Sequence, residues 1–126
     1  MRVDRLYSPK GPRPAGTYSQ AVRAGNLLFI AGQGPLDPQT GEIRGETLAE
    51  QCQLTLQNIK NIVEGHGGDI RNVVKVNVYL ADMDGFSEMD SVYKTFFGEY
   101  PPARTTVGVQ MNDILIEVEA TAVLDD

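Results

Sequence analysis

The most constraining feature of the sequence is a pair of alternating segments near its C-terminal end. Residues 103–111 and 114–124 each alternate apolar and polar side chains with a period of two, which is typical of half-buried β-strands. Asn112 and Asp113 join the two segments, and this dipeptide favours a two-residue hairpin turn. The sequence therefore predicts that the two segments pair as an antiparallel hairpin.

The predicted register sorts the side chains of this hairpin into an apolar face and a polar face. The apolar face pairs Met111 with Ile114, Val109 with Ile116, Val107 with Val118 and Thr105 with Ala120. The polar face carries Arg104, Thr106, Gly108, Glu117, Glu119 and Thr121. A shift of one residue would place valines opposite glutamates, so burial of the apolar face favours this register.

The polar face would gather one guanidinium and two carboxylates, which allows two hypotheses. Arg104 can bind a carboxylate ligand through two parallel hydrogen bonds, while a glutamate within reach of a water moves protons. Gly108, opposite Glu117, would leave room beside that carboxylate. Alternatively, Arg104 and Glu119 form an ordinary cross-strand ion pair. The hairpin by itself favours the ion pair, because ion pairs greatly outnumber active sites.

The remaining elements are predicted from periodicity and turn residues. Strands are expected near residues 3–7, 19–24, 27–31 and 74–80, and helices over residues 47–65 and 86–97. Thr47 and Glu50 have the spacing of a capping box, and the strand at 27–31 reads as well buried. The order of elements predicts an α+β fold, in which two helices cover the apolar face of one mostly antiparallel sheet.

The opposite face of that sheet is predicted to be polar, with Lys75, Asn77 and Tyr79 beside the glutamates. A polar face of this extent suits a subunit interface or a ligand site. The aromatic side chains of the second helix, in contrast, are interpreted as core. Gly32 and Gly34 match no phosphate-binding motif, and we expect them to let the backbone approach another group closely.

Length, charge and cysteine content limit the class of protein. We expect one domain over residues 1–126, since 126 residues suffice for a single core. The net charge of −6 makes nucleic acid an unlikely partner, because its phosphates are bound by clustered basic residues. A single cysteine, Cys52, and the absence of a long apolar run predict a cytoplasmic protein with no membrane contact. His66, the only histidine, has no companion that would suggest a metal site.

Several motifs taken together resemble the Rid (reactive intermediate deaminase, YjgF-like) family. They are Ala31-Gly32-Gln33-Gly34-Pro35, Thr40-Gly41-Glu42, Gln51, Asn58-Ile59, Pro102-Ala103-Arg104-Thr105 and Ile116-Glu117-Val118-Glu119-Ala120. The resemblance extends from about Tyr18 to Val123. It implies a chorismate-mutase-like α+β subunit, assembled as a homotrimer with three clefts between neighbouring subunits. The polar sheet face would then line the interior of the trimer.

The resemblance also implies an activity, the hydrolysis of reactive 2-imino or enamine acids to 2-keto acids and ammonia. This is the reaction of a 2-iminobutanoate/2-iminopropanoate deaminase, a hydrolase acting on C=N bonds that needs no cofactor or metal. By the same resemblance, Arg104 holds the substrate carboxylate and Glu117 positions or activates the attacking water. Tyr18 and Gly32 border the ligand. An imine carbon is already electrophilic, so orientation and one proton shuttle suffice.

Three departures from the family pattern bear on the substrate. Thr106 stands where many deaminating members have cysteine, and Asp90 stands where they often have asparagine. Both are therefore candidate substrate-binding residues. The shorter turn before the last strand leaves open whether Glu117 or Glu119 is the working carboxylate.

Two further functional classes are compatible with the same residues. The cleft could bind a small carboxylate, such as a 2-keto acid, as a regulatory ligand without turnover. A ribonuclease or translation inhibitor, a role assigned to some family members, is the other class. The acidic charge and the lack of a basic, aromatic-rich patch weigh against it.

Overall fold

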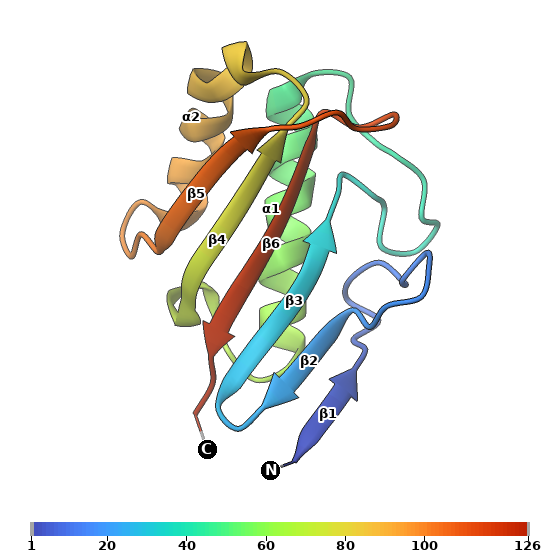
Figure 1. The fold of residues 1–126 in the computed structure, drawn as a ribbon, viewed down its shortest axis with the longest axis vertical. Helices are drawn as coiled ribbons and strands as arrows, with labels where there is room; N and C mark the ends of the chain where they lie inside the picture. The colour runs from blue at the N-terminus through green and yellow to red at the C-terminus, as the bar shows by residue number, and fades with distance from the viewer. Residues whose placement is uncertain (1, 126) are drawn as a thin grey trace.

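The structure is a computed structural model that describes residues 2–125, and it consists of one six-stranded sheet with two helices on one face (Figure 1). The strands are β1 (Val3–Leu6), β2 (Ala21–Ala24), β3 (Leu27–Gln33), β4 (Val73–Leu80), β5 (Ala103–Gly108) and β6 (Ile116–Val123). The helices are α1 (Leu48–Gly65) and α2 (Phe86–Phe97), with short 3-10 turns η1 (Ile70–Asn72) and η2 (Met83–Gly85). The predicted α+β architecture is confirmed.

The strand order corrects the predicted C-terminal hairpin. The order is β1-β2-β3-β6-β4-β5, so β4 lies between β5 and β6 and the two do not pair. β5 runs parallel to β4, whereas the other neighbouring strands are antiparallel. The reason is that α2 connects β4 to β5, and a helical crossover joins strands that lie parallel. Alternation of side chains had described each strand but could not identify its partner.

The same topology overturns the prediction that Arg104 and Glu117 share a face. Arg104 pairs with Val76, which is fully buried beneath the helices, so Arg104 points to the helix-covered face. Glu117 pairs with Tyr79 on the uncovered face. When β5 is aligned with β6 through β4, their alignment differs by one residue from that of the predicted hairpin. A shift of one residue exchanges the two faces of a strand. The predicted ion pair between Arg104 and Glu119 is wrong for the same reason.

The core lies between the helices and the covered face of the sheet. Its fully buried members include Leu28, Cys52, Leu56, Ile59, Ile62, Val76, Val78, Leu80, Met89, Ile116 and Val118. Cys52 is therefore part of the core, and burial raises the pKa of its thiol to about 12. Among residues 2–125, no helix is long and apolar enough to cross a membrane.

The uncovered face of the sheet is mixed in character. Lys75, Asn77 and Tyr79 lie on it as predicted, and Lys75 Nζ donates a hydrogen bond to Thr105 Oγ1 at 2.9 Å. Two large apolar side chains of β3, Leu27 and Phe29, are 40% and 43% exposed there. The prediction that residues 27–31 form a well-buried strand is thus only half right, because Leu28 and Ile30 alone face the core.

One further face assignment in the sheet is corrected. The alternation that places Lys75, Asn77 and Tyr79 on the polar face would bury Val74. Val74 is instead 45% exposed, whereas Val73 is buried. The pairing of β4 with β6 shifts register between Val73 and Lys75. A bulge of this kind changes which side chains point inward.

Both ends of α1 follow the sequence signals. Thr47 accepts a hydrogen bond from the backbone N–H of Glu50 at 3.1 Å, and the Glu50 carboxylate accepts one from the N–H of Thr47 at 3.1 Å. The helix ends at Gly65, and Gly67 then adopts a left-handed conformation with φ of 92°. The predicted capping box is confirmed.

Substitution of the capping residue tests this account of α1. Thr47→Ala should lower the free energy of unfolding by about 1 kcal/mol, because it leaves helix N–H groups without their acceptor. Urea denaturation at fixed protein concentration measures the change. Thr17→Ala, at an exposed loop position, is the matched control. Equal midpoints for the two variants would contradict the capping role.

Candidate functional site

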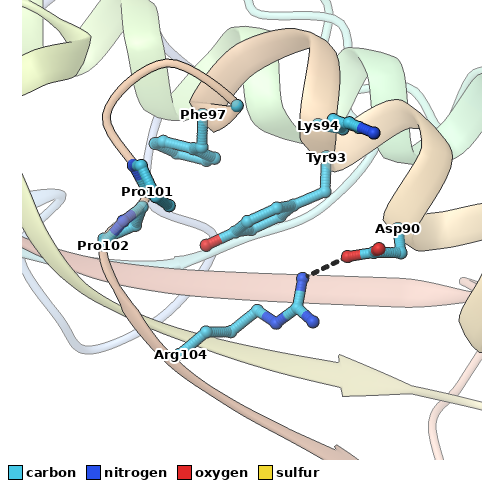
Figure 2. A pocket seen from close by; sticks show the side chains of 8 residues that line it. Asp90, Tyr93, Lys94, Phe97, Pro101, Pro102 and Arg104 are labelled. Carbon is cyan, nitrogen blue, oxygen red and sulfur yellow. Dashed lines mark hydrogen bonds and ion pairs between the residues drawn. The ribbon is translucent and has the colours of Figure 1, made fainter.

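Arg104 lies on β5, and its guanidinium packs against one side of α2 (Figure 2). Arg104 Nη1 donates to Asp90 Oδ1 at 2.6 Å. Its Cζ lies 4.6 Å from the ring centre of Tyr93 and 5.3 Å from that of Phe86. These three partners are spaced four and three residues apart along α2, which places them on one side of the helix. An ion pair and two cation–π contacts together fix the orientation of the guanidinium.

A pocket of about 430 Å³ opens beside this guanidinium. It is lined by Asp90, Tyr93, Lys94, Phe97, Gly98, Pro101, Pro102 and Arg104. Its charged groups are two cations and one carboxylate, so the pocket is locally positive although the whole chain carries −6. Its size and its few polar groups suit a small anionic molecule.

Thr106 lies two residues after Arg104 on the same face of β5, opposite Val78. Its hydroxyl oxygen is buried, and it has no hydrogen-bond partner among residues 2–125. A buried hydroxyl without a partner is costly, and it remains available to a ligand or a water. We refer to Arg104, Asp90 and Thr106 as the arginine half-site.

Glu117 lies on the uncovered face and borders Gly32 of β3. A Cβ atom at position 32 would lie 2.5 Å from Glu117 Oε2, so any larger residue here would displace this carboxylate. The expected close approach at Gly32 is confirmed, and its partner is Glu117. Tyr18, predicted to border the ligand, lies in the loop before β2, where its side chain is 50% exposed and its hydroxyl accepts a hydrogen bond from the N–H of Ala15 at 3.1 Å. We refer to Glu117 and Gly32 as the glutamate half-site.

The hydrogen bonding of the two carboxylates on β6 favours Glu117 over Glu119 as the working group. Glu119 accepts hydrogen bonds from Asn77 Nδ2, at 3.0 Å, and from the Tyr79 hydroxyl. The hydrogen bond between Tyr79 and Glu119 is the main cause of the raised pKa of Tyr79. Within residues 2–125, Glu117 makes no such bond. Glu119 is therefore occupied, whereas Glu117 is free to exchange a proton.

Burial, and then repulsion from Glu119, raises the pKa of Glu117 above its ordinary value. A carboxylate with a raised pKa is a better general base near neutral pH than an ordinary surface glutamate. The environment of Glu117 is thus compatible with proton transfer.

The structure adds residues that the sequence analysis had not assigned to a site. Phe86 and Tyr93 were interpreted as core, and Tyr93 is indeed only 6% exposed, yet both rings also contact the guanidinium. Lys94 lines the pocket. The helical spacing of Phe86, Asp90 and Tyr93 could have indicated a shared stripe, but only the tertiary fold shows that Arg104 packs on it.

The two half-sites lie on opposite faces of the sheet, so one subunit does not bring Arg104 and Glu117 together. No three His, Cys, Asp or Glu side chains in the described part of the chain are grouped so that they could hold a metal ion.

Comparison with known proteins assigns the family. The family described as Endoribonuclease L-PSP matches residues 9–124. This chain belongs to that family, the YjgF/RutC/Rid family. A RutC family protein of Pyrococcus horikoshii is 49% identical over 119 residues, which cover 93% of this chain and 94% of the relative. A RutC family protein of Pyrococcus abyssi is 46% identical, covering 97% and 98% of the two chains.

Solved structures of the Rid family share the fold over nearly the whole chain. A putative endoribonuclease from Thermotoga maritima is 40% identical with a TM-score of 0.93, covering 100% of both chains. RidA from an Antarctic Psychrobacter species is 36% identical with a TM-score of 0.90, covering 96% and 99%. TdcF of E. coli with bound serine is 35% identical with a TM-score of 0.89, covering 97% and 99%. The fold and family implied by the resemblance are confirmed.

The raised pKa of Glu117 gives a prediction for stability. Because the folded state holds this proton more tightly than the unfolded state, the carboxylate destabilises the fold only as pH rises past the ordinary glutamate pKa. Glu117→Gln should raise the free energy of unfolding at neutral pH, by an amount that solvent screening keeps under about 1 kcal/mol. Below about pH 3.5 the gain should disappear.

Urea titrations at both pH values measure this difference, with Glu99→Gln as an exposed control. A Glu117→Gln variant that is less stable than wild type at neutral pH, with no such loss in the control, would contradict the assigned electrostatics.

Proposed function

We propose that this protein hydrolyses 2-imino and enamine acids, of the 2-iminobutanoate and 2-iminopropanoate type, to 2-keto acids and ammonia. The observation that carries the proposal is a guanidinium held rigidly at the wall of a locally positive pocket sized for a small acid. A planar guanidinium binds a carboxylate through parallel hydrogen bonds, and a fixed one orients the reacting carbon. Membership of the Rid family supports the same role.

The chemical step needs one attacking water and one group that moves its proton. The substrate reacts as its protonated imine. Glu117 takes one proton from the water while the water oxygen bonds to the imine carbon, and the C=N electron pair moves onto nitrogen, which gives a carbinolamine. Glu117 then gives this proton to the nitrogen, the C–N bond breaks and the hydroxyl oxygen forms the carbonyl of the 2-keto acid. The hydroxyl proton passes to the departing ammonia, which leaves as ammonium, and Glu117 is again ionised.

Because Arg104 and Glu117 lie on opposite faces of one subunit, we propose that neighbouring subunits of a homotrimer supply them. In each cleft, the arginine half-site of one subunit would face the glutamate half-site of the next. Such head-to-tail contacts close into a ring when the rotation allows it. The exposed apolar side chains of the uncovered face, Leu27, Phe29, Val107 and Val123, support burial against another subunit.

A second candidate function is binding of a small acid without turnover. The similarity to TdcF with bound serine supports a small-molecule ligand for either candidate. Saturable binding of 2-ketobutyrate that is lost in Arg104→Ala, together with no imine hydrolysis by the wild type, would favour the binding role.

Names of several relatives refer to endoribonuclease or translation inhibition. The net charge of −6 weighs against RNA as the substrate, since RNA binding depends on clustered basic groups. RNA cleavage by pure protein that vanishes in Arg104→Ala would favour this role instead.

The role of Arg104 is tested by an assay that couples a dehydratase to this protein and follows keto-acid release from fresh 2-aminoacrylate. Arg104→Ala should abolish the acceleration. Arg104→Lys keeps the charge but loses the fork, and kcat/KM should fall by roughly 10- to 100-fold. Arg2→Lys, at a position where the side chain is 86% exposed, should match wild type. Undiminished acceleration by Arg104→Ala would remove Arg104 from the mechanism.

A further inference from the structure

Asp90 places a carboxylate and a guanidinium side by side in the same pocket. Asp90 Oδ1 accepts from Arg104 Nη1 at 2.6 Å, and both side chains line the pocket of about 430 Å³. This is the one hydrogen bond that the Arg104 side chain makes to residues 2–125, so its other N–H groups remain available. The Asp90 side chain is 47% exposed, and it also has capacity for another donor.

We propose that Asp90 makes this pocket selective for acids that carry an N–H donor on the carbon next to the carboxylate, and that it weakens binding of the matching 2-keto acid. The ligand carboxylate binds the free N–H groups of Arg104, and its nitrogen donates to Asp90. In a 2-keto acid, an oxygen lone pair takes the place of this donor and faces the Asp90 carboxylate. The inference rests on the proposed function, because it takes the same pocket as the ligand site.

This selectivity separates the substrate of the proposed reaction from its product. An imino acid has an N–H next to its carboxylate, and a protonated imine also has a positive charge that Asp90 stabilises. Hydrolysis replaces that nitrogen by an oxygen and releases ammonia. The product therefore has no N–H group that can donate a hydrogen bond to Asp90, and this favours its release.

Asp90 also competes with any ligand carboxylate for Arg104, and the test must separate this general effect from selectivity. Asp90→Asn removes the charge but keeps the shape of the side chain and an oxygen that accepts from Arg104. It should strengthen binding of every carboxylate to Arg104. The ratio of dissociation constants for two ligands with the same carbon skeleton cancels this shared gain.

The experiment measures the Kd of L-2-aminobutyrate and of 2-ketobutyrate by calorimetry, on wild type, Arg104→Ala, Asp90→Asn and Glu99→Gln. Wild type should bind the amino acid more tightly than the keto acid. In Asp90→Asn this preference should fall by roughly tenfold or more, the worth of a hydrogen bond to a charged group. Glu99→Gln removes one exposed negative charge just after α2 and should leave the preference unchanged.

A second readout is inhibition by product in the dehydratase-coupled assay. Added 2-ketobutyrate should inhibit Asp90→Asn at lower concentrations than wild type. A structural role for Asp90 alone would lower the activity without changing the preference between ligands.

The outcomes distinguish this inference from the proposed function. If Arg104→Ala loses both ligands but Asp90→Asn keeps the wild-type preference, Asp90 is not a selectivity residue and the site still stands. Equal affinity of the wild type for both ligands overturns the inference in the same way. If wild type binds neither ligand, or Arg104→Ala binds both unchanged, the proposed site and the inference fail together.

Discussion

The parallel pairing of β4 with β5 decides where the functional side chains of this chain point. It places Arg104 in register with Val76 and therefore beneath α2, on the covered face of the sheet. The antiparallel pairing of β4 with β6 places Glu117 beside Tyr79 on the other face. Because β4 separates these strands, the two groups cannot be brought to one face without moving a strand by one residue, which would expose the core valines.

The position beneath α2 gives the guanidinium its rigidity. A partly buried cation needs a counter-charge, and Asp90 supplies one at 2.6 Å while Tyr93 and Phe86 contact the planar group. A long side chain that is already ordered loses little entropy when it binds a ligand. On the uncovered face, Asn77 and Tyr79 donate hydrogen bonds to Glu119. The carboxylate of Glu117, beside Gly32, has no hydrogen-bond partner within residues 2–125.

Local signals in the sequence predicted local structure well. The capping box of Thr47 and Glu50 and the helix over residues 86–97 both depend on neighbours in the chain, and the structure confirms them. The order of strands and helices predicted the α+β class, and the family resemblance, which combines distant motifs, implied the chorismate-mutase-like subunit. The partner of each C-terminal strand depends on the crossover through α2, and period-2 alternation contains no information about it.

The sequence proposed residues for the candidate site but could not predict their arrangement. Arg104 and Thr106 lie on the covered face of the sheet, where Arg104 pairs with Asp90 of α2, and Gly32 borders Glu117. The predicted hairpin wrongly placed Arg104 and Glu117 on one face. Its register was in error by one residue, and such an error exchanges the faces of a strand. The aromatic contacts to Arg104 were missed because Phe86 and Tyr93 have the spacing of an ordinary core stripe.

The proposed site takes Arg104 from one subunit and Glu117 from the neighbouring subunit. The most direct measurement is imine hydrolysis by assemblies that contain Arg104→Ala and Glu117→Gln chains in equal amounts. Each variant alone should be inactive. In mixed trimers, about a quarter of the clefts should combine an intact Arg104 with an intact Glu117, and activity should return to about that fraction of wild type. Mixed assemblies that stay as inactive as the separate variants would contradict the shared site.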